Sequence, residues 1–190
     1  MWCDNCGLIF PLRSGATVWT VLIVLYSVIG AVFLFYWGPF VYFVSPEWNI
    51  YAVVALLVAG VALLAITGLA TRSYMLTRLT FFVWPPLMVL VAIRAGVMVY
   101  ELNKNQTQFT WECANDYALW PASATAGYAS TGATMPKLLC DYGFHSFYTG
   151  VAASLVLDLV FQIYGWFLVW RYKASLEHAY RLVQTDKTLY

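Results

Sequence analysis

The sequence predicts an all-α integral membrane protein, a bundle of four transmembrane helices with a disulfide-linked outer loop between the third and fourth helices. Of its 190 residues, 62% are apolar, 18% are aromatic and only 10% are charged, whereas an ordinary soluble domain carries about 25% charged residues. A water-soluble domain of this size could not bury so much apolar surface, so lipid is the expected solvent. The net charge of +1 gives no sign of a nucleic-acid partner.

Four charge-poor apolar runs mark the expected membrane spans. Each run has about 21–23 residues, which as a helix is enough to cross a hydrocarbon core of about 30 Å. The runs are continuously apolar rather than alternating, which favours helices over a β-barrel. The predicted spans are 17–37, 50–70, 79–100 and 148–170. The remaining segments are an N-terminal segment, three loops and a tail: 1–16, 38–49, 71–78, 101–147 and 171–190.

Basic residues predict the orientation of the chain. Four spans place the N-terminus, the 71–78 loop and the tail on one side of the membrane. That side carries most of the lysine and arginine, namely Arg13, Arg72, Arg78, Arg171, Lys173, Arg181 and Lys187, against Lys104 and Lys137 on the other. Because loops rich in these residues stay cytosolic, we expect both termini in the cytosol. The expected location is the secretory or endosomal system, at the plasma membrane or an endolysosomal or vacuolar membrane.

The 101–147 loop carries two candidate modifications. Cys113 and Cys140 lie on the predicted oxidising side, where they are natural disulfide partners. The alternative is a pair of free thiols at the membrane surface. Asn105-Gln106-Thr107 is an N-x-[ST] sequon on the same side, which predicts N-glycosylation of Asn105.

Cys3 and Cys6 form a C-x-x-C pair in the predicted cytosolic N-terminal segment. Cysteines close to a membrane are candidate palmitoylation sites, and the alternative is two free thiols near the headgroups. A structural zinc ion needs four ligands. The predicted cytosolic side offers no further cysteine and only one histidine, His178, so no metal site is expected.

Two ionisable residues lie deep inside the predicted spans, Arg94 in the third and Asp158 in the fourth. A lone charge in hydrocarbon is costly, so such residues usually pair or line a cavity. Helical side chains tilt toward the N-terminus of their helix, and these two antiparallel helices therefore tilt Arg94 and Asp158 toward each other. We predict an ion pair. The alternatives are an arginine that reaches the headgroups with Asp158 bonded near Gln162, or a proton or cation site in a transporter.

The tail contains Tyr180-Arg181-Leu182-Val183, which matches the Y-x-x-Φ sorting motif read by clathrin adaptors in extended tails. Leu176, Tyr180 and Val183 also share one face at helical spacing. A helix on the inner leaflet is therefore the alternative, and it would hide the motif.

Two cysteine pairs in a four-span chain also suggest a thiol oxidase of the DsbB and vitamin K epoxide reductase type, which passes electrons to a quinone. Thiol–disulfide exchange needs direct attack of a thiolate on a disulfide. The predicted topology places Cys3 and Cys6 across the membrane from Cys113 and Cys140. Hydrocarbon about 30 Å thick separates the pairs, so the topology disfavours this function.

The chain resembles the lysosome-associated four-span (LAPTM-like) family at both ends. The matching residues are Cys3-x-x-Cys6 followed by Leu12-Arg13-x-Gly15, and the aromatic exit of the fourth span, Tyr164-Gly165-Trp166-Phe167-Leu168-Val169-Trp170-Arg171-Tyr172-Lys173. The resemblance implies a four-span protein of lysosome-associated membranes. The proline-rich PY motifs of the family's tail, which recruit ubiquitin ligases, are absent. MARVEL-type proteins share the four-span topology alone.

The expected function is non-enzymatic, because the sequence shows no Ser/His/Asp set, metal cluster or phosphate-binding loop. We expect an organiser, trafficking adaptor or accessory subunit that binds other integral membrane proteins through its helices and outer loop. Its partners would be membrane lipids, other membrane proteins and, in a homo-oligomer, copies of itself, with no cofactor. The alternative is a small transporter or lipid-binding bundle that uses Asp158 and Arg94.

Overall fold

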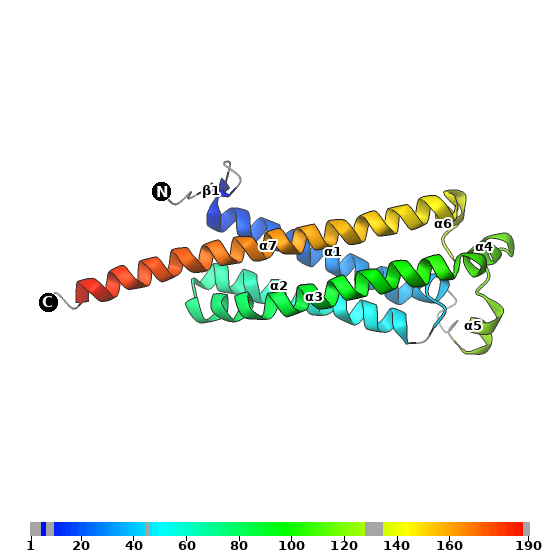
Figure 1. Cartoon of the computed structure of the whole chain (residues 1–190), viewed down its shortest axis with the longest axis horizontal. Coiled ribbons are helices and arrows are strands. Elements are labelled where there is room, and N and C mark those ends of the chain that lie inside the picture. Colours follow the sequence, from blue (N-terminus) through cyan, green and yellow to red (C-terminus); the bar gives the residue numbers. More distant parts are fainter. Residues whose placement is uncertain (1–4, 7–9, 45, 128–134, 188–190) are drawn as a thin grey trace. The chain divides into compact units, whose positions relative to one another are not determined.

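The computed structural model describes residues 5–6, 10–44, 46–127 and 135–187, with side chains over 13–44, 46–127 and 135–178. The described chain is almost entirely helical. Its long helices are α1 (Leu12–Val41), α2 (Glu47–Thr71), α3 (Tyr74–Lys104) and α7 (Gly143–Lys187) (Figure 1). The shorter elements are β1 (Asn5–Cys6), β2 (Phe10–Pro11), α4 (Gln106–Ala114), α5 (Pro121–Thr125) and α6 (Lys137–Asp141). The two short strands pair antiparallel.

In the described part of the chain, four helices are long and apolar enough to cross a membrane, which confirms the predicted helical class and the four candidate spans. The qualifying segments are Arg13–Val41, Glu47–Thr71, Tyr74–Lys104 and Gly143–His178. Each is longer than the span predicted within it, because a helix can continue beyond hydrocarbon. The helix α3 runs on through Pro85 and Pro86. Insertion into a membrane and the orientation of the termini stay predictions.

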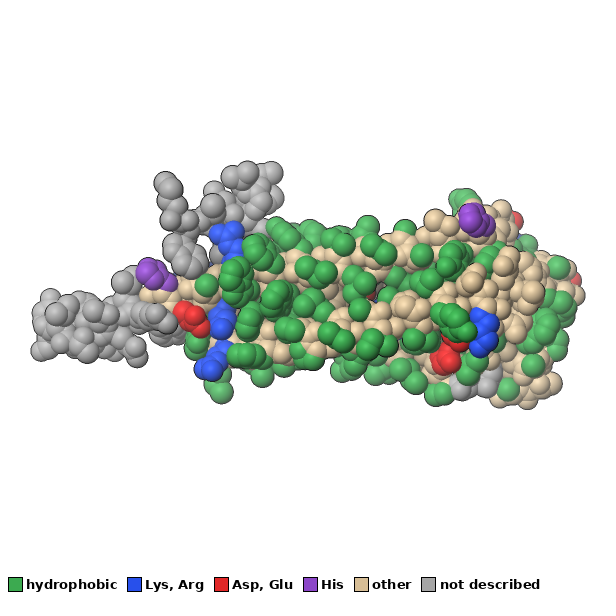
Figure 2. Space-filling view, in the orientation of Figure 1, with side chains coloured by type: hydrophobic (Ala, Val, Ile, Leu, Met, Phe, Trp, Pro, Cys, Tyr) green, Lys and Arg blue, Asp and Glu red, His purple; other side chains and the backbone are tan. Residues whose placement is uncertain are grey.

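Large apolar side chains lie exposed along all four of these helices, and hydrophobic side chains cover much of the surface in view (Figure 2). Examples are Val18 and Ile29 on α1, Ile50 and Leu57 on α2, Phe82 and Ile93 on α3, and Val156 and Ile163 on α7. In water such a surface would drive aggregation, whereas hydrocarbon chains solvate it.

The chain forms two compact units, each built from a segment of every long helix. Unit 1 comprises 1–26, 57–89 and 160–190, and unit 2 comprises 27–56 and 90–159. In unit 1, the buried cluster contains Ala16, Leu69, Leu168 and Tyr172. Trp19 packs edge-to-face on Tyr164 and Phe161, and its Nε1 donates a hydrogen bond of 3.0 Å to the Phe161 carbonyl.

The end of α2 is held by the start of α1 within unit 1. Arg13 donates from Nε to the Leu69 carbonyl (3.1 Å) and from Nη2 to the Ala70 carbonyl (2.7 Å). The last carbonyls of a helix have no partner within it, so this arginine satisfies groups that the helix leaves open. The chain then turns at Arg72, whose φ of 53° is left-handed, before α3 begins.

Small residues let α2 pack closely in the buried part of the structure. Ala52, Ala55, Ala59 and Ala62 recur at helical spacing and are buried. The sequence suggests that Gly60 belongs to the same face as Ala55 and Ala59. That placement is wrong: a Cβ on Gly60 would meet nothing within 4 Å, because Gly60 is about 100° around the helix from Ala59.

Gly38 allows the closest approach in unit 2. A Cβ built there would lie 2.6 Å from Cβ and 2.8 Å from Cγ of Trp48, atoms that cannot move away without shifting the α2 backbone. Trp48 belongs to the main apolar cluster of this unit, together with Tyr42, Tyr51 and Ala52.

We expect Gly38→Ala to destabilise the protein by about 1–3 kcal/mol, the usual cost of overpacking. Gly60→Ala is the matched control, because its open surroundings leave only the gain in helix propensity of up to about 1 kcal/mol. Thermal unfolding of the purified protein in mild detergent measures both. Equal unfolding temperatures for the two variants would contradict the packing at Gly38.

Candidate functional site

The structure brings Arg94 of α3 and Asp158 of α7 together in unit 2. Nη2 of Arg94 lies 3.6 Å from Oδ2 of Asp158, and the two side chains are only 9% and 5% exposed. Nη1 of Arg94 also donates a hydrogen bond of 3.0 Å to the backbone carbonyl of Tyr51 on α2. A single guanidinium therefore links three helices.

Residues close in sequence to Arg94, Asp158 and Tyr51 belong to the buried apolar cluster of unit 2. Ala95 and Met98 on α3, Leu155 on α7 and Ala52 on α2 belong to one buried cluster. In such surroundings each charge needs the other, because removing one leaves an uncompensated buried charge. The pair thus joins α3 to α7, and its arginine adds α2.

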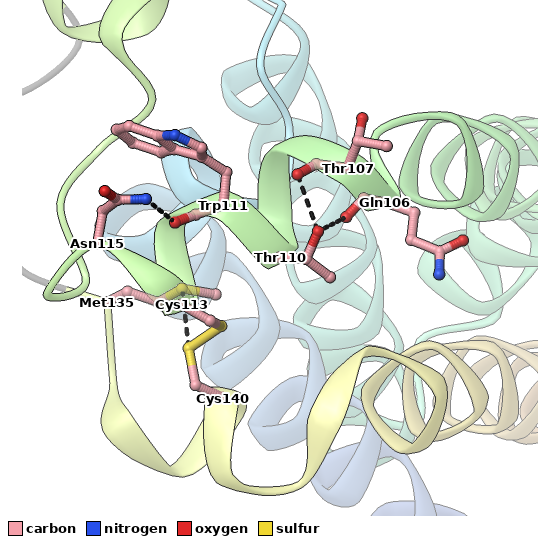
Figure 3. Close-up of a disulfide and its surroundings, with 8 residues drawn as sticks. All are labelled: Gln106, Thr107, Thr110, Trp111, Cys113, Asn115, Met135 and Cys140. Atoms are coloured by element: carbon pink, nitrogen blue, oxygen red, sulfur yellow. Dashed lines mark hydrogen bonds between the residues drawn. A yellow bond between two sulfur atoms is a disulfide. The ribbon is translucent and has the colours of Figure 1, made fainter.

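The 101–147 segment is the second candidate site, and the structure confirms its predicted disulfide. Cys113 on α4 bonds to Cys140 on α6, with their Cα atoms 5.5 Å apart (Figure 3). Met135 lies beside the bond, its Sδ 3.8 Å from Sγ of Cys140. Asn115 closes the end of α4, since its Nδ2 donates to the Trp111 carbonyl at 2.8 Å (Figure 3). The described part of the segment thus contains three short helices, α4, α5 and α6.

Aromatic packing lies behind the disulfide in unit 2. Phe109 on α4 is buried and stacks on Phe147 of α7, with ring centroids 5.2 Å apart. Phe40 of α1 and Met135 complete the buried cluster, and Cys113 and Cys140 pack against it. The aromatic side chains here therefore pack the segment onto the helices.

Glu112 is a buried carboxyl group that the sequence analysis did not single out. Its residue is 0% exposed, and Oε1 accepts a hydrogen bond of 2.7 Å from the backbone N–H of Trp120. Loss of hydration raises the pKa of Glu112 from 4.5 to about 8, although the Trp120 N–H acts in the opposite direction. Glu112 is thus mainly protonated at neutral pH. It fixes the turn after α4, where Asp116 and Tyr117 have positive φ.

Asn105 lies at the junction of α3 and α4. It is only 7% exposed, and its Nδ2, the atom that would carry a glycan, is buried. A glycan there would require this junction to open. The burial disfavours glycosylation of Asn105, which stays a prediction.

The remaining predicted sites lie at the ends of the chain. Cys3 lies outside the described residues, and Cys6 lies in β1 with its side chain outside the description. Palmitoylation of the two stays a prediction. Tyr180 and Val183 lie within the helical range of α7, although their side chains are not among those described. A helical backbone differs from the extended form that sorting adaptors read.

Within the described residues, no group of three or more His, Cys, Asp or Glu side chains is placed to hold a metal ion. The chemistry of the two sites is that of holding helices together, through a buried ion pair in one and a disulfide with a buried carboxyl in the other.

We expect Asp158→Ala to destabilise the protein by about 3–5 kcal/mol, because it leaves Arg94 buried without its counter-charge. Replacing both residues, as Arg94→Leu with Asp158→Ala, should cost less than the sum of Arg94→Leu alone and Asp158→Ala alone. The measurement is thermal unfolding in mild detergent as a double-mutant cycle. Additive losses would mean that the two side chains do not interact.

We expect the contribution of Glu112 to the free energy of unfolding to fall as the pH rises from 4.5 to about 8. In this range the folded protein keeps the proton that the unfolded chain releases, so the unfolded state binds fewer protons and higher pH favours it. Glu112→Gln should remove this part of the slope and stabilise the protein at the upper end of the range. Unfolding at several pH values, with Asp141→Asn at an exposed position as control, measures the effect. An unchanged slope in Glu112→Gln would contradict the burial.

No protein-family model, curated protein or solved structure matches the chain. The resemblance to LAPTM-like proteins therefore stays a prediction.

Proposed function

We propose that the chain is a non-enzymatic integral membrane protein that binds other integral membrane proteins through its helices and its 101–147 segment. It would act as an organiser, trafficking adaptor or accessory subunit, with both termini in the cytosol and the 101–147 segment on the opposite side. The observation that carries the proposal is an open face of small residues on α7.

This α7 face consists of Ser146, Gly150 and Ser154, which recur at intervals of four residues and are all exposed. A Cβ on Gly150 would meet nothing within 4 Å, so no side chain in the described part of the chain covers it. The Ser154 hydroxyl donates to the Val151 carbonyl at 2.8 Å, which keeps it close to its own helix. In membranes, helices associate through such faces because small residues let two backbones approach closely.

The surroundings of the α7 face also favour a helix as its partner. Leu157, three residues after Ser154 and on the same side of the helix, is an exposed apolar residue that a neighbouring helix could cover. Ala92 and Gly96 on α3 form a shorter exposed pair of the same kind, and Gly96 is equally open. Large side chains flank the exposed glycine of α2 instead, since Leu56 and Leu64 lie four residues to either side of Gly60.

The ion pair supports this proposal over a small transporter. A carboxylate that carries protons or cations must exchange them with a water-filled path. Asp158 is 4% exposed and lies beside Arg94, which also bonds the Tyr51 carbonyl. This arrangement suits a fixed joint between helices.

We expect Gly150→Leu to abolish or strongly reduce a stoichiometric partner that co-purifies from native membranes in mild detergent. The leucine side chain would fill the open face and keep a partner helix at a distance, because such interfaces need small residues for the two backbones to approach closely. Quantitative mass spectrometry of the co-purified proteins is the measurement. It also shows whether the partner is a different protein or a second copy of this chain.

Gly60→Leu is the matched control, since it adds the same side chain at an equally open glycine between leucines. It should leave the partner bound. Thermal unfolding of both variants checks that each is folded. Equal partner recovery with both variants would contradict the α7 face, and a purified monomer that moves solute would contradict the proposed function as a whole.

A further inference from the structure

We propose that unit 1 binds the phosphate headgroup of an anionic phospholipid where α2 turns into α3, with Arg72 and Arg78 as its principal ligands. Arg13, Arg171 and Lys173 add positive charge around them. We call this group of five residues the basic cluster. The inference concerns lipid rather than protein partners, and it does not depend on the α7 face.

Contacts around the end of α2 bring the basic cluster together. The Leu69 carbonyl accepts hydrogen bonds from Arg13 and, at 3.5 Å, from the Tyr172 hydroxyl. Tyr172 lies between Arg171 and Lys173 on α7. On the other side of the turn, a Cβ on Gly68 would lie 3.3 Å from Oγ1 of Thr77, the residue before Arg78. Three helices, α1, α3 and α7, and the turn after α2 thus bring their cations to the end of α2 in unit 1.

Charge within unit 1 is strongly unbalanced at this level. Among the side chains that the structure describes in unit 1, Glu177 is the only carboxylate. It is already engaged, since Oε1 lies 3.5 Å from Nζ of Lys173 and accepts a 2.9 Å hydrogen bond from the Tyr74 hydroxyl. Arg72 and Arg78 are exposed and make no ion pair with any side chain in the described part of the chain. Their charge is therefore available to an anion from outside.

The neighbouring surface is apolar, which identifies the anion as a lipid. Met75, Leu79 and Phe82, on the same helix as Arg78, are 83%, 51% and 59% exposed. The Arg78 guanidinium lies 6.0 Å from the centre of the Phe82 ring. Lysine and arginine side chains lie beside hydrophobic ones on the face in view (Figure 2). A free phosphate ion would make no contact with this apolar surface. A phospholipid would place its headgroup on the cations and its acyl chains on Met75, Leu79 and Phe82.

The chemistry of the ligands fits a phosphate group. Arginine presents a planar fork of N–H donors that matches phosphate oxygens. Arginine and lysine side chains close to an anionic leaflet are attracted to its headgroups. The predicted orientation places the basic cluster in the cytosolic leaflet, where anionic lipids are concentrated.

The test is thermal unfolding of the full chain in lipid nanodiscs, followed by tryptophan fluorescence. The nanodiscs contain phosphatidylcholine alone or phosphatidylcholine with phosphatidylserine at about four to one. We expect phosphatidylserine to raise the unfolding temperature of the unaltered protein. In the double variant Arg72→Gln, Arg78→Gln most of this rise should be lost, and in Arg72→Lys, Arg78→Lys part of it should remain because the charge is kept. Arg13 is left unaltered, since it bonds to α2.

The matched control is Lys104→Gln, Lys137→Gln, which removes two positive charges from unit 2. It should keep the full response to phosphatidylserine. Equal responses of the glutamine variant and the unaltered protein would overturn the proposal. An equal loss of the response in Lys104→Gln, Lys137→Gln would also overturn it, because it would indicate a general effect of charge. So would an equal rise in unfolding temperature when inorganic phosphate is added to the protein in phosphatidylcholine discs. Partner recovery by Gly150→Leu remains a separate measurement.

Discussion

The structure of unit 2 depends on one constraint, which is that a charge buried among apolar side chains must be matched. Arg94 meets it with the Asp158 carboxylate and the Tyr51 carbonyl. The energy of such a pair lies less in its attraction than in the cost of leaving either charge alone. Alternative packings of α3 and α7 would separate the two groups, so the pair selects one register of these helices. Apolar contacts alone, being non-directional, would select the register less sharply.

The disulfide and the buried carboxyl constrain the 101–147 segment in different ways. The bond between Cys113 and Cys140 fixes α4 to α6 covalently. Glu112, the residue beside Cys113, instead accepts a hydrogen bond from the backbone N–H of Trp120. Its side chain is fully buried. Both act from the same turn of α4, so this short helix anchors two separate stretches of the segment. The open α7 face begins shortly after the segment's last short helix, at Ser146, on a helix that the same aromatic cluster holds.

Features that depend on chain composition could be predicted from the sequence, whereas features that depend on distant neighbours could not. Uninterrupted apolar runs predicted the four long helices, and the depths of Arg94 and Asp158 predicted that they would face each other. The Cys113–Cys140 bond was predictable from two cysteines in one loop. Glu112 gave no such signal, because Phe40 and Met135 from elsewhere in the chain help to build the apolar packing of its helix. The sequence suggested the wrong helix face for Gly60, because small residues close together in a helix need not share a face. The sequon at Asn105 gave no indication that this side chain is buried.

The hydrogen bonds from Arg13 to Leu69 and Ala70 have a consequence for biosynthesis. They join residues 56 and 57 positions apart, so they can form only after the whole of α2 has left the ribosome. Until then the guanidinium is a cation just ahead of an apolar helix, and in the proposed orientation such a charge would resist translocation of the N-terminus. In that orientation the same side chain would first help to retain the start of the chain on the cytosolic side, and afterwards it holds the end of α2 against the start of α1.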